Sequence, residues 1–143
     1  LCVEFKTEGK QMKTVIVREP REDLQYAPSL VTGFGINDET VENAGMVMGT
    51  SIMPPGGRNY RHYHVNGDLS MYKIKGRDKL LIGPDDDLQE LDFVEGDFVY
   101  IPRGEIHGAY NTLDEPGFLV FCYTGINNVK ELQKVYVEEP PED

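Results

Sequence analysis

The sequence predicts an all-β protein, built as an antiparallel sandwich or barrel. Short runs rich in Val, Ile, Tyr and Phe recur along the chain, and turn-forming stretches such as PPGG, NGD and KGRD separate them. Little of the chain shows the periodicity of an amphipathic helix. Evenly spaced short strands with few helices between them are typical of sandwiches and barrels.

The expected elements follow from these patterns in chain order. The strand-like segments are residues 13–17, 46–53, 69–75, 78–83, 97–102, 106–111 and 117–124. Residues 127–135 are the candidate helix, because Val129, Leu132 and Val135 recur at a spacing of three. We therefore expect strands along most of the chain and a short helix near its C-terminal end.

The 143 residues are expected to form one domain. Its barrel core is predicted over about residues 42–126. Residues 18–45 are polar and irregular, so we expect residues 1–41 to form an N-terminal arm that lies over the barrel. The acidic residues 138–143 are expected to be a frayed tail.

Charge and composition restrict the expected partners and location. The net charge of −11 would repel phosphate backbones and anionic membrane surfaces, so we expect no nucleic-acid or membrane partner. No apolar run approaches the ~20 residues that cross a bilayer, and no signal peptide is evident. The two cysteines do not make a disulfide framework. These features favour a cytoplasmic protein.

The three histidines are the strongest candidates for a functional site. His62 and His64 are two residues apart, so on a strand both side chains leave from the same face. His107 lies on a later predicted strand, and a sheet that folds back on itself as a barrel would bring it opposite the first two. Three converging imidazoles suit a divalent transition metal such as Fe, Mn, Ni, Cu or Zn.

The spacing around these histidines resembles the two motifs of the cupin superfamily. The first motif is matched by Gly56, His62, His64 and Gly76, and the second by Gly96, Pro102, Gly104, His107 and Asn111. The two motifs appear in order, span residues 56–111 and use every histidine of the chain. This resemblance implies a cupin-type jelly roll, or double-stranded β-helix. It also implies a site for a small molecule inside the barrel, and a homodimer.

The chain departs from the motif at one position. Where the family has a metal-binding Glu, the spacing to Gly76 places Leu69, which cannot bind a metal. Asp68 is one residue earlier and would point to the other face, unless a bulge redirects it toward the metal. Asp68 is also a candidate acid or base. The remaining three-histidine set is similar to that of some cupin dioxygenases acting on thiols or β-diketones. Such a neutral set leaves the metal charge uncompensated and favours anionic ligands.

Other residues near the motif are candidates for a pocket. Tyr60 and Met71 would share the inward face with the histidines if the alternation holds, although both could equally be core filling. Leu69 would shape the apolar wall. Lys73 is four residues after Leu69, so on a strand both side chains leave from the same face. Pointing inward, Lys73 could bind an anion or act as an acid; alternatively, it could extend to solvent. Arg58 could reach the barrel mouth.

Three functions are compatible with these features. The first is a three-histidine Fe(II) dioxygenase that acts on a small organic molecule inside the barrel. The second is a lyase or isomerase in which Mn, Ni or Zn polarises a carbonyl group. The third is a module that binds a small molecule without catalysis, because a chain that lacks the motif Glu could also lack a metal. Oxygen dependence separates the first two functions, and metal content separates them from the third.

Overall fold

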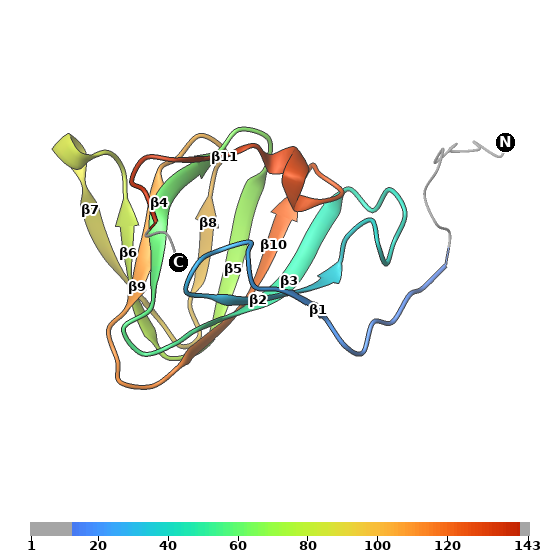
Figure 1. Cartoon of the computed structure of the whole chain (residues 1–143), viewed down its shortest axis with the longest axis horizontal. Helices are drawn as coiled ribbons and strands as arrows, with labels where there is room; N and C mark the ends of the chain where they lie inside the picture. Colours follow the sequence, from blue (N-terminus) through green and yellow to red (C-terminus); the bar gives the residue numbers. More distant parts are fainter. Residues whose placement is uncertain (1–12, 141–143) are drawn as a thin grey trace, which may run out of the picture.

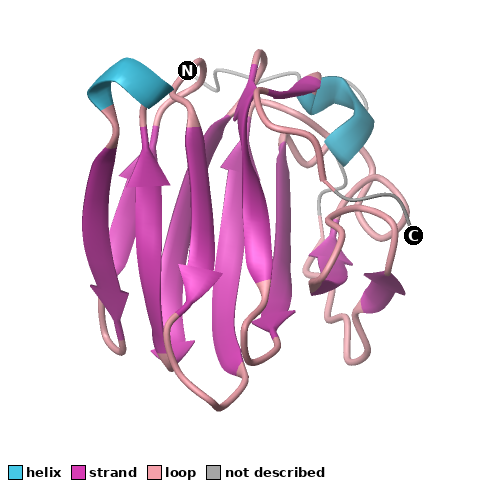
Figure 2. Cartoon of the chain, turned by 60° about the vertical axis from the view of Figure 1, so that its left-hand side comes forward, coloured by secondary structure: helices cyan, strands magenta, loops and turns pink. Residues whose placement is uncertain are grey.

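Two antiparallel β-sheets face each other in the computed structural model, which describes residues 13–140 (Figures 1 and 2). Over these residues, the six-stranded sheet has the order β1 (Arg21–Asp23), β2 (Val31–Ile36), β3 (Met46–Met53), β10 (Gly117–Thr124), β5 (Asp68–Lys75) and β8 (Phe98–Ile101). The five-stranded sheet has the order β11 (Lys134–Tyr136), β4 (Arg58–His64), β9 (His107–Asn111), β6 (Arg77–Ile82) and β7 (Gln89–Val94). The predicted jelly-roll class is confirmed.

The core lies between the sheets because alternate residues of each strand point inward. Along β3, for example, Val47, Ser51 and Met53 are buried, whereas Met48 and Ile52 are exposed. The largest buried apolar cluster includes Phe34, Val47, Leu69, Ile101, Phe121, Tyr123, Ile126 and Leu132. Each such side chain contributes about 1.5–3 kcal/mol of burial free energy, so this interface holds the two sheets together.

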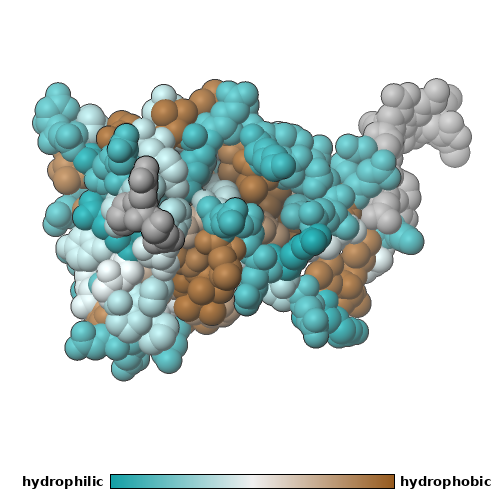
Figure 3. Space-filling model, viewed as in Figure 1, coloured by the Kyte–Doolittle hydropathy of each residue, from teal (hydrophilic) through white to brown (hydrophobic). Residues whose placement is uncertain are grey.

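One face of the molecule is largely polar. Hydrophilic residues cover most of the face seen in Figure 3, with separate hydrophobic areas between them. Acidic residues are gathered in the one-turn helix η1 (Asp85–Asp87), which forms a solvated turn between β6 and β7. Within residues 13–140, no helix is long and apolar enough to span a membrane.

Several predicted strands are confirmed, and the differences have physical causes. The segments 46–53 and 117–124 are β3 and β10, but residues 13–17 form no strand, and Ile16 is 71% exposed. Strand β7 is absent from the predicted strands. Its sequence, QELDFV, does not alternate regularly between apolar and polar residues, and in the structure Phe93 is its one buried residue. The prediction of an irregular arm is wrong over residues 21–23 and 31–36, where β1 and β2 extend the six-stranded sheet. Residues 1–12 lie outside the described part.

The predicted C-terminal helix is also wrong for most of its length. A single 3-10 turn, η2 (Val129–Leu132), begins after Asn128, whose side chain accepts a hydrogen bond from the Glu131 amide. Gln133 adopts a left-handed conformation (φ 54°), which ends the turn. The chain then enters β11 and pairs with β4, so a stretch predicted as helix becomes an edge strand beside the histidines.

Candidate metal centre

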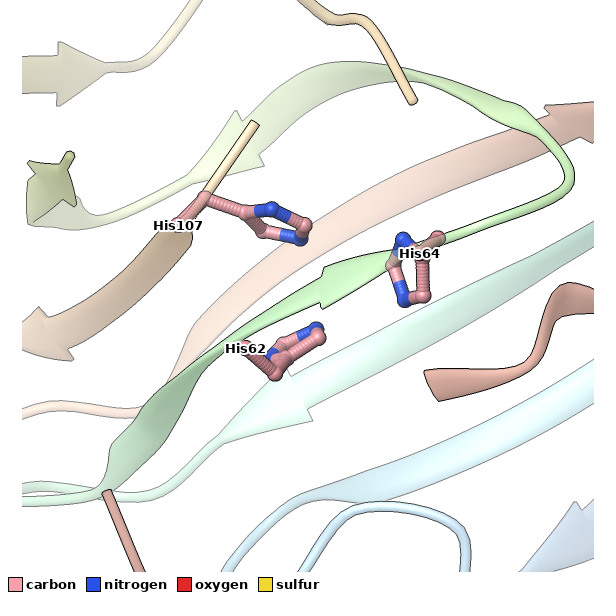
Figure 4. Close-up of side chains that lie close together, drawn as sticks. All are labelled: His62, His64 and His107. Carbon is pink, nitrogen blue, oxygen red and sulfur yellow. The ribbon is translucent and has the colours of Figure 1, made fainter. Parts of the chain in front are cut away.

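The three histidines meet at the inner face of the five-stranded sheet. His62 and His64 leave β4 on the same side, and His107 lies opposite His62 on β9 (Figure 4). The ring centres are 4.9 Å apart for His62 and His64, 4.4 Å for His62 and His107, and 5.0 Å for His64 and His107. All three side chains are buried. Pairing of β4 with β9 in this one sheet places the histidines together. The predicted convergence is therefore found, but it does not require the sheet to fold back on itself as expected.

A β-bulge in β4 sets the direction of these side chains. Asn59 pairs with Ala109 and His62 pairs with His107, so Tyr60 and Arg61 together lie opposite the single residue Gly108. A Cβ atom on Gly108 would lie 2.7 Å from the carbonyl oxygen of Asn59, so the close approach requires glycine. The extra residue reverses the alternation. Asn59 lines the cavity in place of Tyr60.

Backbone carbonyls fix which nitrogen atom of two of the rings carries the proton. Nδ1 of His62 donates to the carbonyl oxygen of Tyr60 at 2.6 Å, and Nδ1 of His107 donates to that of Glu105 at 3.0 Å. A carbonyl oxygen can only accept, so Nε2 of each ring keeps a free lone pair. Among the described residues, the buried Nε2 atoms of His64 and His107 have no hydrogen-bond partner.

This donor set fits a divalent transition metal. One ligand atom from each of the three histidines lies within 4.8 Å of the others. Buried nitrogen atoms without partners are costly unless something binds them, and imidazole is a preferred ligand of Fe, Zn, Ni and Cu. The hydrogen bonds at Nδ1 orient the rings as such partners do in known metal sites.

Burial keeps the imidazoles neutral at neutral pH. Desolvation, with a smaller contribution from neighbouring positive charge, lowers the pKa of His64 to about 3. Desolvation likewise lowers the pKa of His107 to about 4, and it strongly lowers the pKa of His62. A metal therefore displaces no protons from these rings when it binds near pH 7.

The same shifts predict how the stability of the metal-free protein depends on pH. Because the folded-state pKa values of His64 and His107 are about 3 and 4, the unfolded chain binds protons below pH ~6.5 that the folded protein does not. The free energy of unfolding should therefore fall as the pH drops from ~6.5 to ~4, by up to about 1.4 kcal/mol per pH unit for each histidine. Urea unfolding of chelator-treated protein across this range measures the slope. If the unfolding free energy of His64→Gln depends on pH as steeply as that of the wild type, the low pKa of His64 is contradicted.

A cavity of about 60 Å³ adjoins His62 and His107. Of the predicted pocket residues, Leu69, Met71 and Lys73 line it, and they do so from β5. Leu69 is 4% exposed and packs in the core cluster, so its side chain occupies the inward position that the motif gives to Glu. Within residues 13–140, the clustered metal-ligand side chains are the three histidines alone.

Three predicted residues lie away from the cavity. The Asp68 carboxylate accepts hydrogen bonds from the backbone and guanidinium of Arg103 at 2.9–3.2 Å, and these bonds lower its pKa. Arg58 binds Glu138 at 2.9 Å and lies over the ring of Tyr60. The structure therefore does not bring Asp68, Arg58 or Tyr60 to the histidines. Within the expected tail, Glu138 accepts hydrogen bonds from the Arg58 guanidinium and from the Arg61 amide, whereas residues 141–143 lie outside the described part.

Lys134 is the main site residue that sequence reasoning missed. It pairs with His64 across β11 and β4 and lines the cavity. Its Nζ donates to the Tyr26 carbonyl oxygen at 3.2 Å and lies 4.7 Å from the ring centres of Tyr26 and Tyr136. Burial lowers its pKa to about 8, so it remains mostly protonated at neutral pH.

Two tyrosines complete this side of the cavity. Tyr26, from the loop between β1 and β2, and Tyr123, from β10, share a hydrogen bond of 2.6 Å between their hydroxyl groups. The ring of Tyr123 contacts that of His64 edge-on, with centres 5.1 Å apart. Burial raises the pKa of Tyr123 to about 12, so it is neutral. The predicted arm thus contributes directly to the cavity wall.

Comparison with known proteins agrees with this geometry. The sequence model of the Cupin domain matches residues 49–123, more than half of the chain, including all three histidines. The chain belongs to the cupin family. A search of curated protein sequences finds no significant match to this cupin.

Solved structures show the same fold at low sequence identity. One is an uncharacterized conserved protein with a double-stranded β-helix domain from Klebsiella pneumoniae, with a TM-score of 0.64 and 19% identity over 78% of this chain and 87% of that one. An oxalate oxidase has a TM-score of 0.65 and 18% identity, over 99% of this chain and 75% of its own. Bacillus subtilis oxalate decarboxylase, which has Mn(II) centres, has a TM-score of 0.64 and 18% identity over 84% of this chain. The cupin spans only 30% of that enzyme's length.

Proposed function

We propose that this cupin is a metal-dependent enzyme that oxidises a small organic anion with molecular oxygen, and that its metal is Fe(II). The observation that carries the proposal is the set of buried, neutral histidines beside a cavity in which Leu69 replaces the motif Glu. His62, His64 and His107 would hold the metal. When bound, the metal would supply redox chemistry and a site for an anionic group of the substrate.

The charge around the cavity supports an anionic substrate. The ligand set is neutral, and the ammonium group of Lys134 adds a positive charge to the same cavity wall. In a buried site a charge-assisted hydrogen bond is about twice as strong as a neutral one, so Lys134 would bind and orient a carboxylate, enolate or thiolate. Asp68, the nearest carboxylate in the first motif, is held by Arg103 and does not oppose this charge.

The remaining wall would keep water away from the reacting groups. Leu69, Met71, Leu119 and Phe121 line the cavity from β5 and β10, and Ala27 and Leu30 line it from the β1–β2 loop. A dry, low-dielectric cavity strengthens the attraction between Lys134 and an anion, and it protects a reactive intermediate from hydrolysis. The volume of about 60 Å³ favours a small substrate.

A lyase or isomerase is the second candidate, and Lys134 and Tyr123 favour it. Both carry protons beside the histidines, so either could donate a proton to a carbanion or enolate. The metal in this case would be Mn, Ni or Zn and would polarise a carbonyl group. Turnover without oxygen distinguishes this reaction from the first.

Oxygen consumption tests the proposal directly. Protein loaded with Fe(II) is presented with a panel of small carboxylates, β-diketones and thiols, and oxygen uptake is recorded. The Lys134→Met variant should raise KM about 10- to 100-fold, because one charge-assisted hydrogen bond is lost. Lys130→Met, at an exposed position of η2, serves as the control and should leave KM unchanged. Turnover that persists under anaerobic conditions would overturn the dioxygenase and favour the second candidate.

A further inference from the structure

A second polar cluster lies in the same cavity, at a distance from the histidines. Lys73 on β5 and Asp78 on β6 form an ion pair of 2.6 Å that links the two sheets, and each side chain is only 1% exposed. Both residues line the cavity. A fully buried ion pair is rare because removing both charges from water costs more than a surface pair returns, so its presence calls for an explanation.

Strand register places this pair at the opposite end of the cavity. On β6, Ile82 pairs with His107, whereas Asp78 pairs with Asn111, four residues along the strand. On β5, Leu69 pairs with Tyr123 beside His64, whereas Lys73 is four residues further on. Four residues of a β-strand span about 13 Å, and the side chains at both ends shorten the gap between them. Met71 on β5 and Leu80 on β6 line the space between the two ends and are apolar.

The pair keeps hydrogen-bonding capacity that the protein does not use. Within the described part of the chain, Oδ1 of Asp78 is buried and has no hydrogen-bond partner. The Lys73 ammonium donates one of its three N–H groups to Oδ2 of Asp78. A buried acceptor left without a donor is destabilising. If this ion pair served only to join the sheets, we would expect both carboxylate oxygens to accept hydrogen bonds.

Two hydroxyl groups extend this polar end. Thr32, Ser51 and Lys73 lie in one row across the six-stranded sheet, because Thr32 pairs with Ser51, Ser51 with Leu119, and Leu119 with Lys73. Thr32 and Ser51 are both buried and line the cavity. The cavity therefore has two polar ends, separated by an apolar middle.

We infer that Lys73 and Asp78 bind the far end of the substrate, and that this end is a neutral group that both donates and accepts a hydrogen bond, such as a hydroxyl. This inference rests on the proposed function, which places the anionic end of the substrate at the histidines and Lys134. The ion pair has no net charge, so a second anion would be repelled by Asp78 and a cation by Lys73. A hydroxyl group can donate to Oδ1 of Asp78 and accept from Nζ of Lys73.

Matched probes test the inference without any turnover. Short straight-chain carboxylates that end in a hydroxyl group are compared with the same carboxylates ending in a methyl group, by calorimetry on the metal-loaded protein. In the wild type the hydroxyl series should bind about tenfold more tightly at its best chain length, the effect of one or two buried hydrogen bonds. Equal affinity of the two series, or no binding by either, would overturn the inference.

Variants separate recognition from a purely structural role. The double variant Lys73→Met/Asp78→Leu removes both charges together, which buried pairs often tolerate when the volume is kept. It should retain its metal and its affinity for the methyl series, and lose the preference for hydroxyl. Lys79→Met/Asp92→Leu removes an exposed pair of similar geometry (2.8 Å) on β6 and β7 and should keep that preference.

The outcomes distinguish this inference from the proposed function. A preference for the hydroxyl series that disappears in Lys73→Met/Asp78→Leu supports the inference even if no oxygen is consumed. A preference that survives in that variant overturns it even if the protein proves to be a dioxygenase. If the double variant does not fold, Asp78→Asn replaces it, because the amide keeps the size of the side chain and presents a different donor and acceptor pattern. The preference should then fall rather than stay unchanged.

Discussion

Replacing His107 with alanine is expected to lower the affinity of the protein for Fe(II) by more than about 100-fold, and His62→Ala should do the same. Loss of an outer-shell partner alone costs metal sites about 10–100-fold in affinity, and here one of three ligands is removed. Only two imidazoles would then remain, because within the described residues the cluster of candidate ligands contains no carboxylate. Metal content, measured by mass spectrometry on protein purified without chelators or a histidine tag, checks this expectation.

The control for this experiment lies on the same strand. Tyr63 is between the two histidines of β4, so its side chain leaves from the opposite face, and Tyr63→Phe should retain about as much metal as the wild type. Near-stoichiometric metal in His107→Ala would contradict the three-histidine site. A wild-type protein that holds no metal after addition of Fe, Mn, Ni or Zn would also contradict it, and would favour a binding module without catalysis.

The convergence of the histidines could be predicted from the motif spacing, but its cause is the direct pairing of β4 with β9 in one sheet and not a sheet that folds back on itself. The alternation of side chains put Leu69, Met71 and Lys73 on one face of a strand, although core filling by Met71 and extension of Lys73 to solvent stayed open. The structure has all three on the cavity wall. The argument failed at Tyr60 because it assumes unbroken alternation. The bulge opposite Gly108 breaks that alternation, and a bulge depends on the partner strand, which the local sequence does not specify.

Lys134 was missed for a related reason. Along residues 134–137, Lys and Tyr alternate with two valines, and a half-buried strand would normally turn the valines inward. The structure does the reverse: Val135 and Val137 are 39% and 43% exposed, while Lys134 lines the cavity. Lys73 and Asp78 could not be paired from sequence either, because they belong to different sheets and meet only when the sheets pack.

Leu69→Glu is expected to have opposite effects on the metal-free and the metal-loaded protein. Leu69 is 4% exposed, so a carboxylate there would be buried and should lower the free energy of unfolding of the metal-free protein by about 3 kcal/mol. With Fe(II) present, the same carboxylate would add a ligand and a compensating charge, raising metal affinity by roughly tenfold or more. Thermal unfolding with and without Fe(II), together with calorimetry, measures both effects.

The anion preference of the site should change with the same substitution. A glutamate at position 69 would neutralise part of the metal charge, so the affinity for a small anionic probe such as azide should fall at least about tenfold. Leu69→Gln is the matched control, because it is nearly the same size as Glu and leaves the charge unchanged. If Leu69→Glu and Leu69→Gln bind metal and azide equally, position 69 does not face the metal. If they differ as expected, leucine at this position is what leaves the centre open to an anionic substrate.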